Sequence, residues 1–124
     1  MFKYTENLFL MKNSKYQELI QKLLNCALAC ENCATACLEE EDVKMMVPCI
    51  KLDRDCADIC LQAARLLQRQ SDIALQYLLL CEEICRKCGE ECGKHEHDHC
   101  QACARACLDC AEACHANHES IKQD

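Results

Sequence analysis

The chain has 124 residues and a formal net charge of −7, and 16 of its residues are cysteine. Its length corresponds to a single domain. The negative charge argues against nucleic acid or an anionic membrane surface as a partner. With 2 glycines and 1 proline, the chain also lacks the turn-forming residues of an all-β fold with many short strands.

Helix-forming residues dominate the chain between its cysteines. Residues 1–13 are predicted as an N-terminal extension, either a short helix or disordered chain. The bundle is expected over 14–118, and a polar C-terminal tail over 119–124. The four helices are predicted at 14–40, 43–70, 72–93 and 98–118.

Local signals support these helices, with one ambiguity. Ser14 and Gln17 have the spacing of a capping box at the start of the first helix. Pro48 would lie inside the second helix if that helix began at Val43, where it would remove a hydrogen bond. It would occupy the favoured first position if the helix began at Val47. Both alternatives remain open from the sequence.

The cysteines are separated mainly by steps of 3, 4 or 7, which place residues on one face of an α-helix. The pattern C-x3-C-x2-C-x3-C occurs over 26–37, 81–92 and 103–114. The first and last of these segments agree at 8 of 12 positions, which indicates an internally repeated helical unit. The cysteines are Cys26, Cys30, Cys33, Cys37, Cys49, Cys56, Cys60, Cys81, Cys85, Cys88, Cys92, Cys100, Cys103, Cys107, Cys110 and Cys114.

Four helices with short loops predict an all-α fold, an antiparallel up-down-up-down four-helix bundle with a cysteine-lined core. The first and third loops would lie at one end, which we call the mouth. At 1.5 Å per residue, the deepest cysteines on the four stripes would lie roughly 20–27 Å from it. The opposite end would be packed by aliphatic side chains, namely Leu19, Ile20, Leu23, Leu24, Leu66, Leu67, Leu75 and Leu78.

Neither ordinary core packing nor disulfides explains the thiols well. Cysteine can act as a small hydrophobic residue, but that does not account for 16 cysteines confined to one half of a bundle. No apolar run approaches the roughly 18 residues of a membrane span, and no signal-peptide pattern is visible. We therefore expect a cytoplasmic protein with reduced thiols, in which such a cysteine content points to metal.

Three metals compete for these thiols. Cu(I) is soft and prefers thiolates, and a C-x3-C pair on one helix can converge on a single ion. Zinc or cadmium would need four-ligand sites built across helices. Iron–sulfur clusters use other spacings, often followed by proline. The sequence favours multiple Cu(I) ions per chain.

The three stripes, together with the segment CIKLDRDCADIC from Cys49 to Cys60, resemble the cytosolic type of the cysteine-rich four-helix-bundle copper storage proteins. The resemblance covers nearly the whole chain after about residue 14. It implies reversible storage of many Cu(I) ions along the core, loaded from one open end, and a tetramer of bundles. It does not identify the partner that exchanges copper, for which a copper chaperone or small thiols are candidates.

Further ligands are expected near the mouth. The steps of the second helix would place a cysteine at position 53, but the residue is aspartate, and its carboxylate would face the interior. Thioethers and imidazoles in the first and third loops could add weaker, exchangeable ligands for copper uptake. The possible mouth ligands are Asp53, Met45, Met46, His95, His97 and His99.

The predicted function is therefore copper storage for buffering or detoxification, not enzymatic catalysis. A less selective thiolate sponge for Zn, Cd or Ag is one alternative, and an iron–sulfur or thiol redox protein is another. The metal-free protein should still fold, because its aliphatic end and amphipathic helices do not depend on copper.

Overall fold

The computed structural model describes the backbone of residues 16–122 and the side chains of residues 16–117. This part of the chain folds into four helices: α2 (Gln17–Cys37), α3 (Val43–Gln68), α4 (Ala74–Gly93) and α5 (Asp98–Lys122). The predicted extension 1–13 and the capping residue Ser14 lie outside the described residues.

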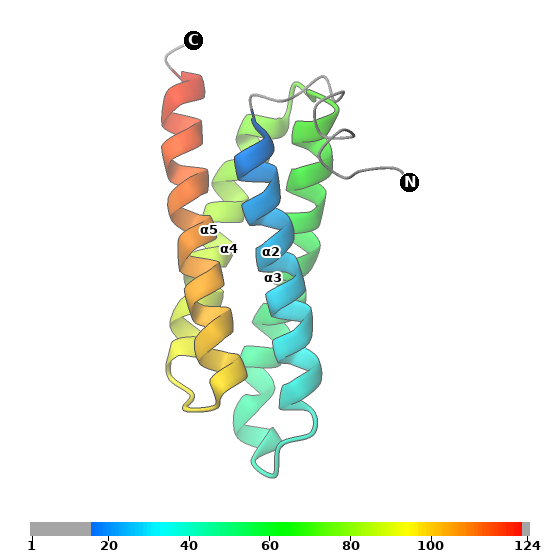
Figure 1. Ribbon diagram of the computed structural model, residues 1–124, viewed down its shortest axis with the longest axis vertical. Coiled ribbons are helices and arrows are strands. Elements are labelled where there is room, and N and C mark those ends of the chain that lie inside the picture. The colour runs from blue at the N-terminus through cyan, green and yellow to red at the C-terminus, as the bar shows by residue number, and fades with distance from the viewer. Residues whose placement is uncertain (1–15, 123–124) are drawn as a thin grey trace, which may run out of the picture.

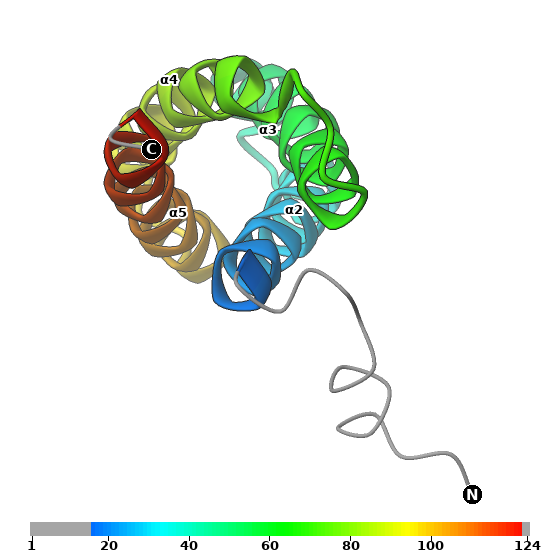
Figure 2. The same cartoon turned by 90° about the horizontal axis from the view of Figure 1, so that it is seen from above.

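The helices form an antiparallel four-helix bundle, as predicted. Each helix packs against the next in the chain, and α5 closes the ring against α2, as Figure 2 shows from above. The α2–α3 and α4–α5 loops lie together at the lower end of the bundle in Figure 1, while the α3–α4 loop and the C-terminus lie at the upper end. The lower end is the predicted mouth.

The ends of two helices differ most from the prediction. Helix α2 ends at Cys37, and the turn after it is tightened by the bond from the Glu40 amide to the Cys37 carbonyl, at 3.2 Å. The acidic run 39–42 explains this early end, because negative charge is unfavourable at the C-terminal end of a helix dipole. In contrast to α2, helix α5 is longer than predicted: it continues to Lys122, past the predicted end at residue 118.

The structure decides the position of Pro48. Helix α3 begins at Val43, so that Pro48 lies inside it. Because proline has no N–H, the carbonyl of Lys44 loses the helical partner that another residue at this position would supply.

The core has the two halves expected from the sequence. Leu19, Leu23, Leu67 and Leu78 are at most 2% exposed and pack the end opposite the mouth. Each such leucine contributes roughly 1.5–3 kcal/mol of burial free energy. Toward the mouth, cysteine replaces leucine as the main buried residue. None of the helices in the described part of the chain is long and apolar enough to cross a membrane.

Candidate metal centre

All 16 cysteines are free thiols buried in the interior, with at most 1% of any of them exposed. Their placement follows from the local spacing, since steps of three and four residues keep each stripe on one face of its helix. Because the bundle turns all four of these faces inward, thiols that are distant in sequence become neighbours. Cys26 and Cys107, for example, lie with their sulfurs 3.8 Å apart.

The thiols form overlapping groups of four along the bundle axis. Within each group, the ligand atoms all lie within 4.8 Å of one another. The three deeper groups overlap: Cys26 belongs to two of them, and so do Cys30 and Cys107. From the aliphatic end toward the mouth, three of these groups are Cys26, Cys60, Cys85 and Cys110; Cys26, Cys30, Cys56 and Cys107; and Cys30, Cys88, Cys103 and Cys107.

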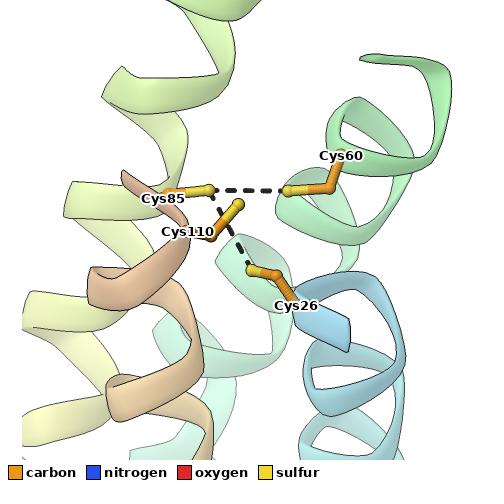
Figure 3. Close-up of side chains that lie close together, drawn as sticks. All are labelled: Cys26, Cys60, Cys85 and Cys110. Atoms are coloured by element: carbon orange, nitrogen blue, oxygen red, sulfur yellow. Dashed lines mark hydrogen bonds between the residues drawn. The ribbon is translucent and has the colours of Figure 1, made fainter. Parts of the chain in front are cut away.

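The first group takes one thiol from each of the four helices, and the side chains point toward a common centre (Figure 3). The sulfur of Cys85 lies 3.5 Å from that of Cys60 and 4.0 Å from that of Cys26. Cys81 extends the network deeper, with its sulfur 3.5 Å from Cys60 Sγ. Since zinc–sulfur bonds of about 2.3 Å would put tetrahedral thiolates roughly 3.8 Å apart, this spacing fits metal–thiolate bonding in general.

Asp53 interrupts the thiol network near its middle. Its side chain is fully buried, and it is the only charged residue that is buried among residues 16–117. The Oδ1 atom accepts hydrogen bonds from the thiols of Cys88 at 3.1 Å, Cys103 at 3.2 Å and Cys92 at 3.3 Å. Oδ2 accepts a further one from Cys49 at 3.6 Å. Burial raises the pKa of Asp53 to about 8, so that the carboxyl group competes with the thiols for protons near neutral pH.

The electrostatic environment favours a soft cation. Burial raises the pKa of Cys37 to about 11 and also raises the pKa of Cys100. The buried part of residues 16–117 contains no lysine, arginine or histidine that could balance thiolate charge. A bound metal ion must therefore supply this positive charge itself, and a monovalent soft ion suits shared thiolates.

At the mouth, one histidine joins the thiols. His99 Nδ1 lies 3.5 Å from the sulfur of Cys33, 3.6 Å from Cys100 and 3.9 Å from Cys37. These four side chains form another possible metal group. Nearby, the sulfurs of Cys49 and Cys92 approach to 2.9 Å and connect this end to Asp53.

The structure separates the other predicted mouth residues into different environments. Met46 is fully buried, whereas Met45 is 68% exposed and lines a surface hollow of about 300 Å³ together with His95 and His97. His95 pairs with Glu91, with Nε2 and Oε2 2.8 Å apart. Their role as metal ligands remains a prediction.

His97 is held by two carboxylates, Asp42 at 3.1 Å and Glu40 at 3.2 Å. Glu40 also contacts His99, with Oε2 2.8 Å from Nε2. Sequence reasoning missed Glu40, because nothing distinguishes it from the other acidic residues of the run 39–42.

Comparison with known proteins identifies similar chains. A family model described as copper storage protein matches residues 12–119. The cysteine-rich protein YhjQ of Bacillus subtilis strain 168 is 50% identical over 95 residues, which cover 77% of this chain and 88% of that protein.

Solved structures show the same similarity. The Cu(I)-bound copper storage protein BsCsp3 is 48% identical with a TM-score of 0.79, covering 82% of this chain and 95% of that one. A cytosolic copper storage protein from Streptomyces lividans, loaded with five coppers, is 38% identical with a TM-score of 0.80, covering 84% and 92%. A Streptomyces lividans structure loaded with 10 copper equivalents is 37% identical with a TM-score of 0.80, covering 88% and 87%.

Proposed function

The chain belongs to the copper storage protein family, and from this premise we propose that it stores multiple Cu(I) ions as thiolate complexes inside its four-helix bundle. The observation that carries the proposal is the series of overlapping thiol groups along the bundle axis. A chain with one structural metal site would need only one such group. Storage, rather than catalysis, is the role that the family description names.

Shared thiolates make a high copper content favourable. A Cu(I) ion bound by two separate thiolates leaves a net negative charge in a buried site, which is costly. When each thiolate bridges two ions, the charge for each metal falls. Since neighbouring groups share Cys26, Cys30 and Cys107, we expect a capacity that approaches one copper for each cysteine.

The mouth supports uptake of copper from outside. Cys33, Cys37 and Cys100 combine with His99 to offer a mixed nitrogen and sulfur site where the interior meets the loops. Asp53 then lies between this site and the deeper thiols, where it accepts hydrogen bonds from Cys88 and Cys103. Met46, which is buried near the same end, can add a thioether ligand.

The cellular setting is also part of the proposal. Because the relative from Streptomyces lividans is described as cytosolic, we place this protein in the cytoplasm, where a copper chaperone or small thiols would exchange copper at the mouth. The stored copper would serve buffering or detoxification.

Association of the bundle into a tetramer remains an expectation from the family resemblance. It is supported by a groove between α2 and α3, of about 490 Å³, in which Leu28 is 70% exposed and Leu61 is 47% exposed. Arg54 and the acids Glu31 and Asp58 border this groove. Two copies facing each other could pair these opposite charges around the leucines.

An anaerobic Cu(I) titration of the reduced, copper-free protein against a competing cuprous chelator tests the proposed function. We expect tight binding of ten or more ions per chain. A Cys85→Ser, Cys110→Ser variant removes two ligands from the group in Figure 3 and should bind fewer Cu(I) ions per chain than the natural protein. Saturation of the natural protein at two ions or fewer would refute storage. Parallel titrations with Zn, Cd and Ag separate a copper store from a less selective thiolate sponge.

A further inference from the structure

The His99 side chain uses both of its ring nitrogens, and they face opposite kinds of partner. Nδ1 points toward the mouth thiols, 3.5 Å from Cys33 Sγ and 3.6 Å from Cys100 Sγ. Nε2 lies 2.8 Å from Oε2 of Glu40, in the loop between α2 and α3. His99 is 16% exposed and Glu40 29% exposed, so that solvent competes only partly for this contact.

The identity of the Nε2 partner determines which nitrogen can bind metal. An ionised carboxylate only accepts hydrogen bonds, so the Nε2 atom facing Glu40 must carry the proton. In the neutral ring, the lone pair is then on Nδ1, where the thiols are. Histidines that bind metals typically donate their second N–H to a carboxylate, which sets the tautomer and orientation and makes the ligand nitrogen more basic.

Glu40 is itself held in place. His97 Nδ1 lies 3.2 Å from the same Oε2 atom, and His97 Nε2 lies 3.1 Å from Asp42. The rings of His97 and His99 are stacked, with centroids 5.3 Å apart and planes within 4° of parallel. Both nitrogens of His97 therefore face carboxylates, and this ring supports Glu40 rather than presenting a lone pair to the thiols.

We propose that Glu40 is a positioning residue for copper uptake, which holds the Nε2–H of His99 so that Nδ1 faces Cys33, Cys37 and Cys100. The inference rests on the proposed storage function and deepens it, because it separates the histidine that receives copper from the one that supports its partner. Glu40 touches no thiol in its assigned role and acts only through His99.

The first test uses the copper-free protein. In nitrogen-15 spectra of the histidine rings at pH 8, we expect Nε2 of His99 to be protonated and Nδ1 to be unprotonated. In an E40A variant, we expect the Nε2–H signal to be lost through exchange with water, while the exposed neighbour variant E39A leaves it unchanged. A proton on Nδ1 of His99 in the natural protein would overturn the proposal.

The second test measures copper uptake from a cuprous chelator complex under anaerobic conditions. Loss of a carboxylate partner typically weakens metal binding or activity by 10–100-fold, so we expect E40A to slow initial uptake by about 10-fold. E40Q, which keeps an acceptor oxygen without the charge, should show an intermediate rate. Total capacity should stay unchanged in E40A and E40Q, because the deeper thiols are intact.

A double-mutant cycle separates positioning from a general structural effect. If Glu40 acts through His99, the E40A substitution should have no further effect on the uptake rate in an H99A background. An equal slowing by E40A in both backgrounds, or no slowing in either, would overturn the inference. Both results would leave storage intact, whereas failure of the natural protein to take up copper would refute the proposed function itself.

Discussion

Replacing Asp53 with asparagine tests how the bundle accommodates a carboxyl group within its thiols. Asp53 is fully buried, and burial raises its pKa from 3.8 to about 8. At 1.36 kcal/mol for each tenfold change, the copper-free native state favours the neutral carboxyl by about 6 kcal/mol relative to the unfolded chain. Asparagine keeps nearly the same shape and an acceptor oxygen, but it does not ionise.

The sign of the pH dependence follows from proton binding. Between pH 4 and pH 8, the native protein keeps the Asp53 proton while the unfolded chain releases it. The free energy of unfolding therefore falls as pH rises through this window. Relative to D53N, we expect the natural protein to lose up to about 6 kcal/mol of stability between pH 4 and pH 8.

The assay is urea unfolding of reduced, copper-free protein, followed by helical circular dichroism at several pH values in this window. The exposed residue Asp55 lies two positions away on the same helix and supplies the control D55N. This control should follow the natural protein at every pH. If D53N and the natural protein showed the same change with pH, the assignment of a raised pKa to Asp53 would be wrong.

Three further predictions concern the helices and the thiols. L23A, in the aliphatic end, should lower the free energy of unfolding by about 3 kcal/mol with copper capacity unchanged. The control L79A, at a position 47% exposed, should change it by less than about 0.5 kcal/mol. Equal losses in urea unfolding would contradict the two-part core. P48A restores an N–H toward the Lys44 carbonyl inside α3 and should raise the free energy of unfolding by about 1–3 kcal/mol. A urea midpoint lower than that of the natural protein would count against this account. Because burial raises the pKa of Cys37 to about 11, protons compete increasingly with metal as pH falls, and copper retained against a cuprous chelator should decrease steadily from pH 8 to pH 5. Retention that did not change with pH would argue against thiolate ligands.

The aliphatic end also predicts that folding does not depend on copper. Leu19, Leu23 and Leu78 are buried in the hydrophobic core. Their packing does not need copper, so removal of copper should leave the helical content intact. Circular dichroism before and after anaerobic treatment with a strong cuprous chelator measures this directly. Loss of helicity on copper removal would show that metal is required for folding.

Much of the fold could be predicted because its determinants are local. Helix propensity and cysteine steps of three and four residues predicted four amphipathic helices and their inward faces. The short loops predicted the antiparallel order, and the structure confirms it. The sequence predicted the end of α2 at residue 40, because the residues there have high helix propensity. The helix in fact ends at Cys37, because the acidic run after it is unfavourable at a helix C-terminus.

The details of the mouth could not be predicted in the same way. Met45 and Met46 are adjacent, yet one is 68% exposed and the other fully buried, because neighbouring helix positions differ in direction by about 100°. The sequence grouped His97 and His99 together as possible ligands, while in the structure His99 alone of the pair contacts the thiols.

By itself, the sequence determined the helices, the thiol-bearing faces and the preference for a soft metal, because these depend on residue type and on spacing within one helix. The tertiary structure alone decided which thiols form common groups, that Asp53 lies among four of them, and that Glu40 meets His99 across 59 positions of the chain. These contacts depend on the rotation and axial position of each helix relative to its neighbours. Both are set by packing of the whole bundle rather than by any local pattern.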